Sequence, residues 1–279
     1  MKKEKPVPIS RLSRLTSLGS LVSKVAGNIL VDSAKQWPTG RSTTVKELLV
    51  QPKNIEHLRP FASASIGQVH IAHRDNGEKL AVKVQYKGVA KAISSDVDNV
   101  ALLLKMSGLL PKHINIEPLL EEAKAQLLME ADYIQEAAFI NEYRDVLSDQ
   151  IFVLPEVDSD LSTQAILVMN FIDGMPIDEV ETLDQALKNK VVASLIALFF
   201  DELFSYQLMQ TDPNFANYLF QIDTEKIVLL DFGATRHIPP NISTGYLALI
   251  NAGINNDESG MVNAARDIGF FQDDIDSAY

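Results

Sequence analysis

The chain has 279 residues, of which 46% are hydrophobic and 22% charged, a composition typical of globular proteins with one large domain or two lobes. Its formal net charge of −12 argues against nucleic acid as a partner, because phosphate binding needs clustered Lys and Arg. The absence of Cys excludes disulfides, zinc–thiolate sites and thiol catalysis.

The N-terminal residues 1–53 form a basic arm with ten Lys or Arg against three acidic residues. Apolar residues of the stretch LTSLGSLVSKVAGNILV recur at helical spacing, with Arg11, Arg14 and Lys24 close by. This pattern predicts an amphipathic helix suited to a membrane surface. A helix docked on the globular body, a solvated tail and part of an organelle transit peptide remain open as alternatives.

A β-hairpin is predicted after a short first strand and a small-residue turn. Its two strands are Gln68–Ala72 and Lys79–Gln85, and Asp75-Asn76-Gly77 forms the turn between them. Asn-Gly between alternating apolar runs is a strong hairpin signal.

Lys83 lies in the second strand of this hairpin, between Val82 and Val84. Alternation along a strand turns the Lys side chain away from the face on which the two Val side chains lie. Upstream, residues 62–67 are mostly small and would let the backbone approach phosphate groups. The loop at 62–67 and Lys83 together form a candidate nucleotide site. A single Lys in a strand more often faces solvent, however.

The next segments alternate between helical and extended patterns. Glu117 to Leu147 is predicted as a long helix that is broken near Asp132 to Ile134. The further predicted elements are strands at Phe152–Val157 and Ala165–Phe171, a turn at Asp173-Gly174 that links two lobes, and a helix at Asp184–Met209.

The stretch 210–236 carries the strongest chemical signal. Asp212 precedes Asn217 by five positions, and Asp231 opens a DFG triplet after a predicted strand. Two short strands, Tyr218 to Ile222 and Lys226 to Leu230, would bring Asn217 and Asp231 to the same end of a hairpin. Hard oxygen ligands of this kind suit Mg²⁺ when phosphates and water complete its coordination. This spacing is that of phosphoryl-transfer enzymes of the protein-kinase type.

A helix acid paired with Lys83 would orient the ammonium toward nucleotide phosphates. Glu136 is the first choice for this acid and Glu130 the second. Asp132 and Glu136 are four residues apart and would share one helix face. Outside this context, acids on a long helix usually form a solvated face.

Five segments occur in an order that resembles the UbiB family of atypical kinase-like proteins. They are FASASIGQVH, AVKVQYKGV, MEADYIQEA, QTDPNFAN and LLDFGATR, and they run from about Pro60 to Arg236. The segment PVPISRLSRLTSLGSLVSKVAGN also resembles the region before the core of eukaryotic and related bacterial members. An Ala- and Ser-rich loop replaces the Gly-rich loop of ordinary kinases.

The resemblance implies an α+β, bilobal protein-kinase-like fold. An N-lobe at 54–172, with an antiparallel sheet and a long helix, would precede a mainly helical C-lobe at 173–279. It also implies an atypical kinase or ATPase that binds ATP or ADP with Mg²⁺ and supports ubiquinone biosynthesis or lipid homeostasis. Membrane lipid or quinone-pathway enzymes are the expected partners. The expected location is a membrane surface, reached from the cytoplasm of a bacterium or from the mitochondrial matrix, with a soluble intracellular location as the alternative.

The resemblance also assigns roles to the candidate site residues. Lys83, the strand Lys, and Asp212 are the catalytic residues, while Asn217 and Asp231 are metal ligands. The remaining nucleotide-site residues are Ala62, Ser63, Ala64 and Ser65 of the loop, Glu130 and Asp132 of the family's ExD motif, and Glu136 as the partner of Lys83.

Two features depart from the family pattern. No KxGQ motif precedes the Ala-rich loop, and the C-lobe is expected to be truncated at Tyr279. Two other functions stay open: a catalytically weak nucleotide-binding scaffold, and a small-molecule kinase of the aminoglycoside-phosphotransferase type.

Overall fold

The computed structural model describes residues 61–64, 66–107, 116–147 and 151–270. The basic arm and Ser65 lie outside these residues, as does the predicted amphipathic helix. The described part is a mixed α+β structure with two four-stranded sheets and one two-stranded sheet. This agrees with the predicted fold class.

The first sheet has the strand order β1 (Ala62–Ala64), β2 (Gly67–His73), β3 (Lys79–Gln85) and β5 (Ile166–Asn170). All its neighbouring strands are antiparallel. The predicted hairpin is therefore confirmed, with β3 at the predicted bounds and β2 one residue longer at each end. Ala72, Leu80, Val82 and Val168 form a small buried cluster. Because side chains alternate along β3, Lys83 points away from the face of Val82.

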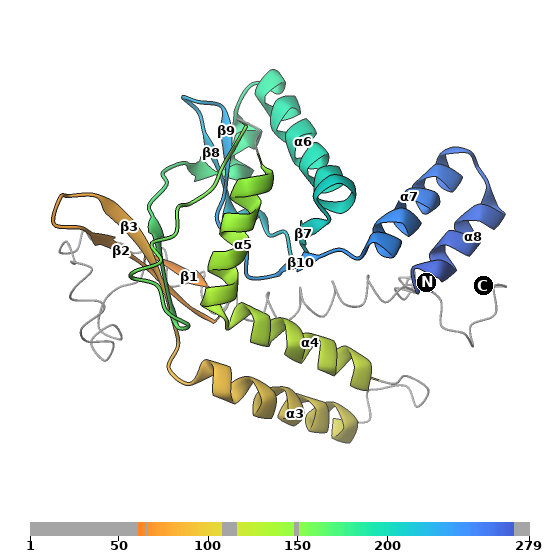
Figure 1. Cartoon of the computed structure of the whole chain (residues 1–279), viewed down its shortest axis with the longest axis horizontal. Coiled ribbons are helices and arrows are strands. Elements are labelled where there is room, and N and C mark those ends of the chain that lie inside the picture. Colours follow the sequence, from red (N-terminus) through yellow and green to blue (C-terminus); the bar gives the residue numbers. More distant parts are fainter. Residues whose placement is uncertain (1–60, 65, 108–115, 148–150, 271–279) are drawn as a thin grey trace, which may run out of the picture.

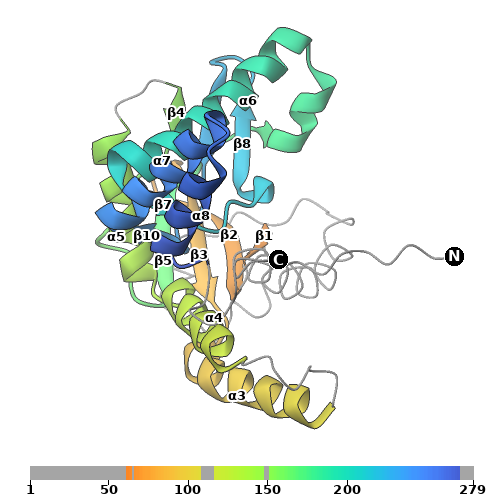
Figure 2. The same ribbon diagram turned by 90° about the vertical axis from the view of Figure 1, so that its right-hand side faces the viewer.

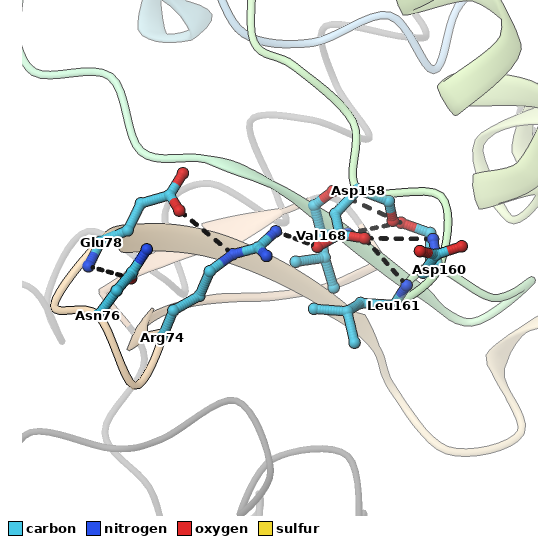
Figure 3. Close-up of polar contacts among 8 residues, drawn as sticks. Arg74, Asn76, Glu78, Asp158, Asp160, Leu161 and Val168 are labelled. Atoms are coloured by element: carbon cyan, nitrogen blue, oxygen red, sulfur yellow. Dashed lines mark hydrogen bonds and ion pairs between the residues drawn. The ribbon is translucent and has the colours of Figure 1, made fainter.

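The tip of the β2–β3 hairpin is tied to the chain that leads into β5 (Figure 3). Arg74 forms an ion pair with Asp158 and lies 3.3 Å from the Glu78 carboxylate. The Asp158 carboxylate also accepts hydrogen bonds of 3.2 Å from the backbone nitrogens of Asp160 and Leu161. The hairpin tip and this turn are therefore held in one arrangement.

Three helices follow the hairpin: α3 (Val89–Ser107), α4 (Glu117–Glu130) and α5 (Tyr133–Val146). Helices α3 and α4 lie side by side and extend away from the first sheet (Figures 1 and 2). The predicted break near Asp132 is confirmed. Asp132 is the N-cap of α5, and its carboxylate accepts hydrogen bonds from the backbone nitrogens of Ile134 and Gln135 at 3.1 and 3.2 Å.

The second sheet has the order β4 (Phe152–Val153), β9 (Lys226–Leu229), β8 (Tyr218–Gln221) and β6 (Met175–Pro176). Strands β8 and β9 form the hairpin predicted from the sequence. Strand β4 is much shorter than predicted and pairs in parallel with β9. A strand from the range assigned to the N-lobe therefore belongs to the second sheet.

The helix predicted at Asp184–Met209 ends earlier than expected. Helix α6 (Gln185–Phe200) continues as a π-helix at Asp201–Tyr206, and Gln207 then takes a left-handed conformation with φ of 51°. The prediction for the last residues was wrong because β7 (Leu208–Gln210) pairs with β10 (Thr235–His237) instead. Single turns of π-helix occur frequently near functional sites.

The chain closes with α7 (Pro240–Ile254) and α8 (Glu258–Asp267), which pack against each other on the side away from the first sheet (Figure 1). A 3₁₀ helix at Ile177–Thr182 precedes α6, and a short one at Phe215–Asn217 precedes β8. Among the described helices, none is both long and apolar enough to cross a membrane.

The largest hydrophobic core joins α5 to the second sheet and to α6. Tyr143 of α5, Phe220 of β8 and Leu198 of α6 all belong to it, and so does Phe232 of the DFG triplet. This core fixes α5 beside the segment 210–236, which determines where the candidate site forms.

Candidate active site

A pocket of about 670 Å³ lies where the first sheet, α5 and the segment 210–236 meet. This volume is in the range usual for sites that bind small molecules. Its lining includes Ala62, Ala64, Lys83, Glu130, Glu136, Asp212, Asn217 and Asp231. Most of the residues proposed from the sequence therefore face one cavity.

Lys83 and Glu136 form a buried ion pair in this pocket. The Lys83 Nζ atom lies 2.6 Å from Glu136 Oε1, and their side chains are 10% and 1% exposed. Glu136, the first choice from the sequence, is thus the helix acid that contacts Lys83. Burial alone would lower the pKa of Lys83, but Asp231 and Glu136 together raise it above its ordinary value. The ammonium group therefore stays charged.

Asp231 is the second anion beside Lys83. Its Oδ1 lies 3.2 Å from Lys83 Nζ and accepts a hydrogen bond of 3.2 Å from the backbone nitrogen of Gly233. Burial opposes the charged form of Asp231, but Lys83 and the Gly233 hydrogen bond together hold its pKa below the ordinary value. Asp231 is therefore an ionised carboxylate that faces the pocket.

Asn217 lies next to Asp231, as the predicted hairpin requires. Asn217 Nδ2 donates to Asp231 Oδ2 at 2.8 Å, and the backbone nitrogen of Leu230 donates to the Asn217 carbonyl at 3.1 Å. The Asn217 amide oxygen is the atom that could ligate a cation. One carboxylate and one amide oxygen fit Mg²⁺, which takes few protein ligands when phosphates bind it too.

Asp212 lies on the rim of the pocket and is exposed to solvent. Partial burial and the nearby Asp231 carboxylate raise its pKa above the ordinary value. The preceding Thr211 donates from Oγ1 to the Ala234 carbonyl at 2.7 Å and from its backbone nitrogen at 3.1 Å. These bonds link the Asp212 segment to the residues that follow Asp231.

The remaining predicted site residues differ in their positions. Ala62 and Ala64 line the pocket, the side chain of Ser63 is outside the description, and Ser65 is outside the described residues. Glu130 also lines the pocket, and its Cγ is 3.7 Å from the place that a Cβ on Gly233 would take. Asp132 is absent from the described lining, because its carboxylate caps α5.

The sequence analysis missed further residues of the pocket lining, among them Gln210 and Tyr133. Gln210 donates from Nε2 to the backbone carbonyl of Asp231 at 2.8 Å. Tyr133 lines the pocket next to Lys83, with Nζ at 5.6 Å from its ring centroid. Both lie in segments that carried the family resemblance, QTDPNFAN and MEADYIQEA, but neither was assigned a role there.

A second buried acid lies behind the pocket, in the π-helix. Glu202 accepts a hydrogen bond of 2.7 Å from the hydroxyl of Tyr143, and burial raises its pKa to about 7. The Gln210 backbone also hydrogen bonds to Glu202, which stabilises the ionised form. The Tyr143 ring packs edge-on against Phe232, with 4.9 Å between ring centroids. Glu202 therefore contacts two residues that hold the Asp231 segment: Tyr143, which packs against Phe232, and Gln210, which bonds to the Asp231 carbonyl.

Comparisons with known proteins agree with this geometry. A family model described as the ABC1 atypical kinase-like domain matches residues 54–265. The chain is 38% identical over 213 residues to the Danio rerio protein named atypical kinase COQ8B, mitochondrial, covering 76% of this chain and 34% of that protein. For the Rattus norvegicus protein of the same name, identity is 39% over 212 residues, covering 76% of this chain and 40% of the relative. The chain thus spans less than half the length of these two relatives.

A solved structure, of Rv3197 from Mycobacterium tuberculosis in complex with erythromycin, has the same fold. It superposes with a TM-score of 0.61 at 22% identity, covering 95% of this chain and 70% of that one. The kinase-like fold predicted from the sequence is thereby confirmed. Together with the family match, these likenesses show that the chain belongs to the ABC1 (UbiB) family of atypical kinase-like proteins.

Proposed function

We propose that this chain binds a Mg²⁺–nucleotide complex in the pocket and acts as an atypical kinase or ATPase. The observation that carries the proposal is the position of Lys83 Nζ, 2.6 Å from Glu136 and 3.2 Å from Asp231. A buried ammonium held between two carboxylates in a cavity is a charge arrangement suited to phosphate recognition.

Each polar group has a separate task in this proposal. Glu136 orients the Lys83 ammonium, which contacts the α- and β-phosphates of ATP or ADP. Asp231 and Asn217 would hold Mg²⁺, which would neutralise the phosphate charge. The Gln210 amide fixes the Asp231 backbone through its 2.8 Å hydrogen bond. Ala62 and Ala64 bring the small-residue loop against the nucleotide.

Asp212 is the proposed catalytic residue. It orients the attacking hydroxyl or water and accepts its proton, as the corresponding Asp does in kinases. Its exposure leaves room for an acceptor at the rim of the pocket. The pKa, raised by burial and by Asp231, brings the carboxylate closer to the range of a useful base.

Nucleotide-dependent phosphate release by the purified chain tests this function. The Asp212→Asn variant should lose about 10²-fold or more in rate while keeping nucleotide affinity. Asp223→Asn, which removes an exposed acid from the β8–β9 turn, is the matched control and should retain the wild-type rate. Binding without any rate difference between wild type and Asp212→Asn would favour the scaffold. Transfer of phosphate to a soluble metabolite would favour the small-molecule kinase.

Support for a biological role comes from relatives that are named mitochondrial atypical kinases of the COQ8 type. We propose that this chain supports ubiquinone biosynthesis from the surface of a membrane, together with enzymes of that pathway. Residues 1–41 are the proposed membrane contact. Flotation with anionic liposomes should fall when they are removed, and unchanged flotation would contradict the contact.

A further inference from the structure

Tyr133 carries a buried hydroxyl that no role described above uses. The residue is 1% exposed, and its Oη has no hydrogen-bond partner among the described residues. Tyr133 begins α5 and lies three residues before Glu136, so the two side chains share one helix face. Both line the pocket, and the Tyr133 ring lies beside the Lys83 ammonium at 5.6 Å from its centroid.

The hydroxyl lies close to Gly67, the first residue of β2. A Cβ built on Gly67 would lie 2.9 Å from Tyr133 Oη and 2.3 Å from the Val84 carbonyl oxygen. The hydroxyl therefore lies against the start of β2, directly after the small-residue loop. This places it between the loop and Lys83, the two parts of the pocket that we propose to contact phosphates.

Tyr133 can act only as a neutral donor in this environment. Burial raises its pKa above the ordinary value, and the carboxylates of Glu136, Asp231 and Glu130 add to this effect against the opposing influence of Lys83. A phenol that stays protonated needs an acceptor for its O–H. Leaving a buried donor without an acceptor is unfavourable, so the group indicates a ligand atom that the nucleotide-free chain does not supply.

We propose that the Tyr133 hydroxyl donates a hydrogen bond to a phosphate oxygen of the bound nucleotide. Tyr133 is thereby a phosphate-binding residue, which acts beside Lys83 without adding charge. This inference rests on the proposed nucleotide function and extends it to Tyr133, a residue of the MEADYIQEA segment to which the sequence analysis assigned no role.

The test compares ADP binding to the wild-type chain and to Tyr133→Phe by titration calorimetry. A hydrogen bond to a charged phosphate predicts that affinity for ADP falls about tenfold. Affinity for adenosine, which has no phosphate, should stay the same. Tyr246→Phe removes a partly buried phenol on α7 and is the matched control, with ADP affinity unchanged.

Thermal unfolding separates this role from a structural one. Because Oη has no partner in the described chain, Tyr133→Phe should leave the melting temperature without nucleotide unchanged or raise it, while reducing the increase caused by ADP. A lower melting temperature without ADP and an undiminished ADP-induced increase would mean that the hydroxyl serves the protein itself, which overturns the proposal.

Two further outcomes are decisive. Equal ADP affinity of wild type and Tyr133→Phe overturns the role of Tyr133 and leaves the nucleotide function intact, whereas a wild-type chain that binds no ADP overturns both. If Tyr133→Phe does not fold, a crystal structure of the wild-type chain with ADP gives the answer. Oη must then lie within hydrogen-bond distance of a phosphate oxygen.

Discussion

Two buried glutamates support the Asp231 segment in different ways. Glu136 lies on α5 at the pocket and pairs with the Lys83 cation at 2.6 Å. Glu202 lies in the π-helix behind the pocket and pairs with a neutral phenol, Tyr143, at 2.7 Å. Burial raises the pKa of each carboxyl to about 7, although Lys83 opposes the shift at Glu136.

The difference lies in what each carboxyl leaves unpaired. Glu136 Oε2 is buried and has no hydrogen-bond partner among the described residues, whereas both Tyr143 and the Gln210 backbone bond to Glu202. The buried Glu136 carboxylate is stabilised by a single cation of the described chain, Lys83. Its energy therefore changes when a further charge enters the pocket, and such sensitivity suits a site that binds charged ligands. A carboxyl satisfied by neutral donors suits support of the fold.

Removal of the cation should have the largest effect. Lys83→Met leaves Glu136 and Asp231 without their shared partner, and loss of one member of a buried pair costs about 3–5 kcal/mol. We expect this loss in urea unfolding, together with loss of measurable nucleotide binding. Adding Glu136→Gln to Lys83→Met should restore more than half of the stability but no binding. If the double variant were as unstable as Lys83→Met alone, the unpaired Glu136 charge would not be the cause of the instability.

The second effect concerns pH and Glu202. A carboxyl with a pKa raised from 4.5 to about 7 on folding binds more protons in the folded state, so its contribution to stability is complete below pH 4.5 and is lost as pH rises toward 7. The shift corresponds to at most about 3 kcal/mol.

Glu202→Gln removes this titration. The free energy of unfolding, followed by urea titrations at several values of pH, should therefore fall less steeply between pH 4.5 and 7 than in the wild type. An identical slope in both proteins would show that the Tyr143 hydroxyl and the Gln210 backbone keep the pKa of Glu202 near normal.

A smaller effect is expected from the phenol that faces Glu202. Tyr143→Phe keeps the ring contact with Phe232 but removes the 2.7 Å hydrogen bond, at a cost of about 1–2 kcal/mol. ADP affinity should change less than threefold, because the Gln210 bond to Asp231 remains. A loss of affinity as large as that of Lys83→Met would place Glu202 in the binding machinery.

Local patterns made much of the first sheet and of the site predictable. Asn76-Gly77 fixed the hairpin that carries Lys83, and the short strands around Asp223 brought Asn217 and Asp231 together. Both are short-range effects, in which turn chemistry and alternation determine geometry. The pairing of Lys83 with Glu136 is long-range, and it was proposed by analogy with the strand Lys and helix acid of protein kinases rather than from a local pattern.

Other features depend on tertiary contacts that no local pattern contains. The orphaned Tyr133 hydroxyl depends on how closely Gly67 approaches, and the π-helix follows from the buried Glu202 and the β7–β10 pairing. Helix α3 was not predicted. It buries Ile93 and Val97 but leaves Val100 and Leu102 50% and 57% exposed, so burial along this helix is incomplete in the described part of the chain.

The Arg74–Asp158 pair at the hairpin tip can be compared with the buried Lys83–Glu136 pair, because the Arg74 cation is exposed to water (Figure 3). The Arg74 and Asp158 side chains are 41% and 13% exposed, against 10% and 1% for Lys83 and Glu136, so solvent reaches this pair more readily than the buried one. Arg74→Met should therefore cost less than about 1 kcal/mol in urea unfolding and leave ADP affinity unchanged. Asp158 also keeps its bonds to the backbone of Asp160 and Leu161, so the turn should survive. Arg74→Met could instead destabilise the chain as much as Lys83→Met. The cost of an unpaired carboxylate would then depend on the loss of its cation and not on how deeply the pair is buried.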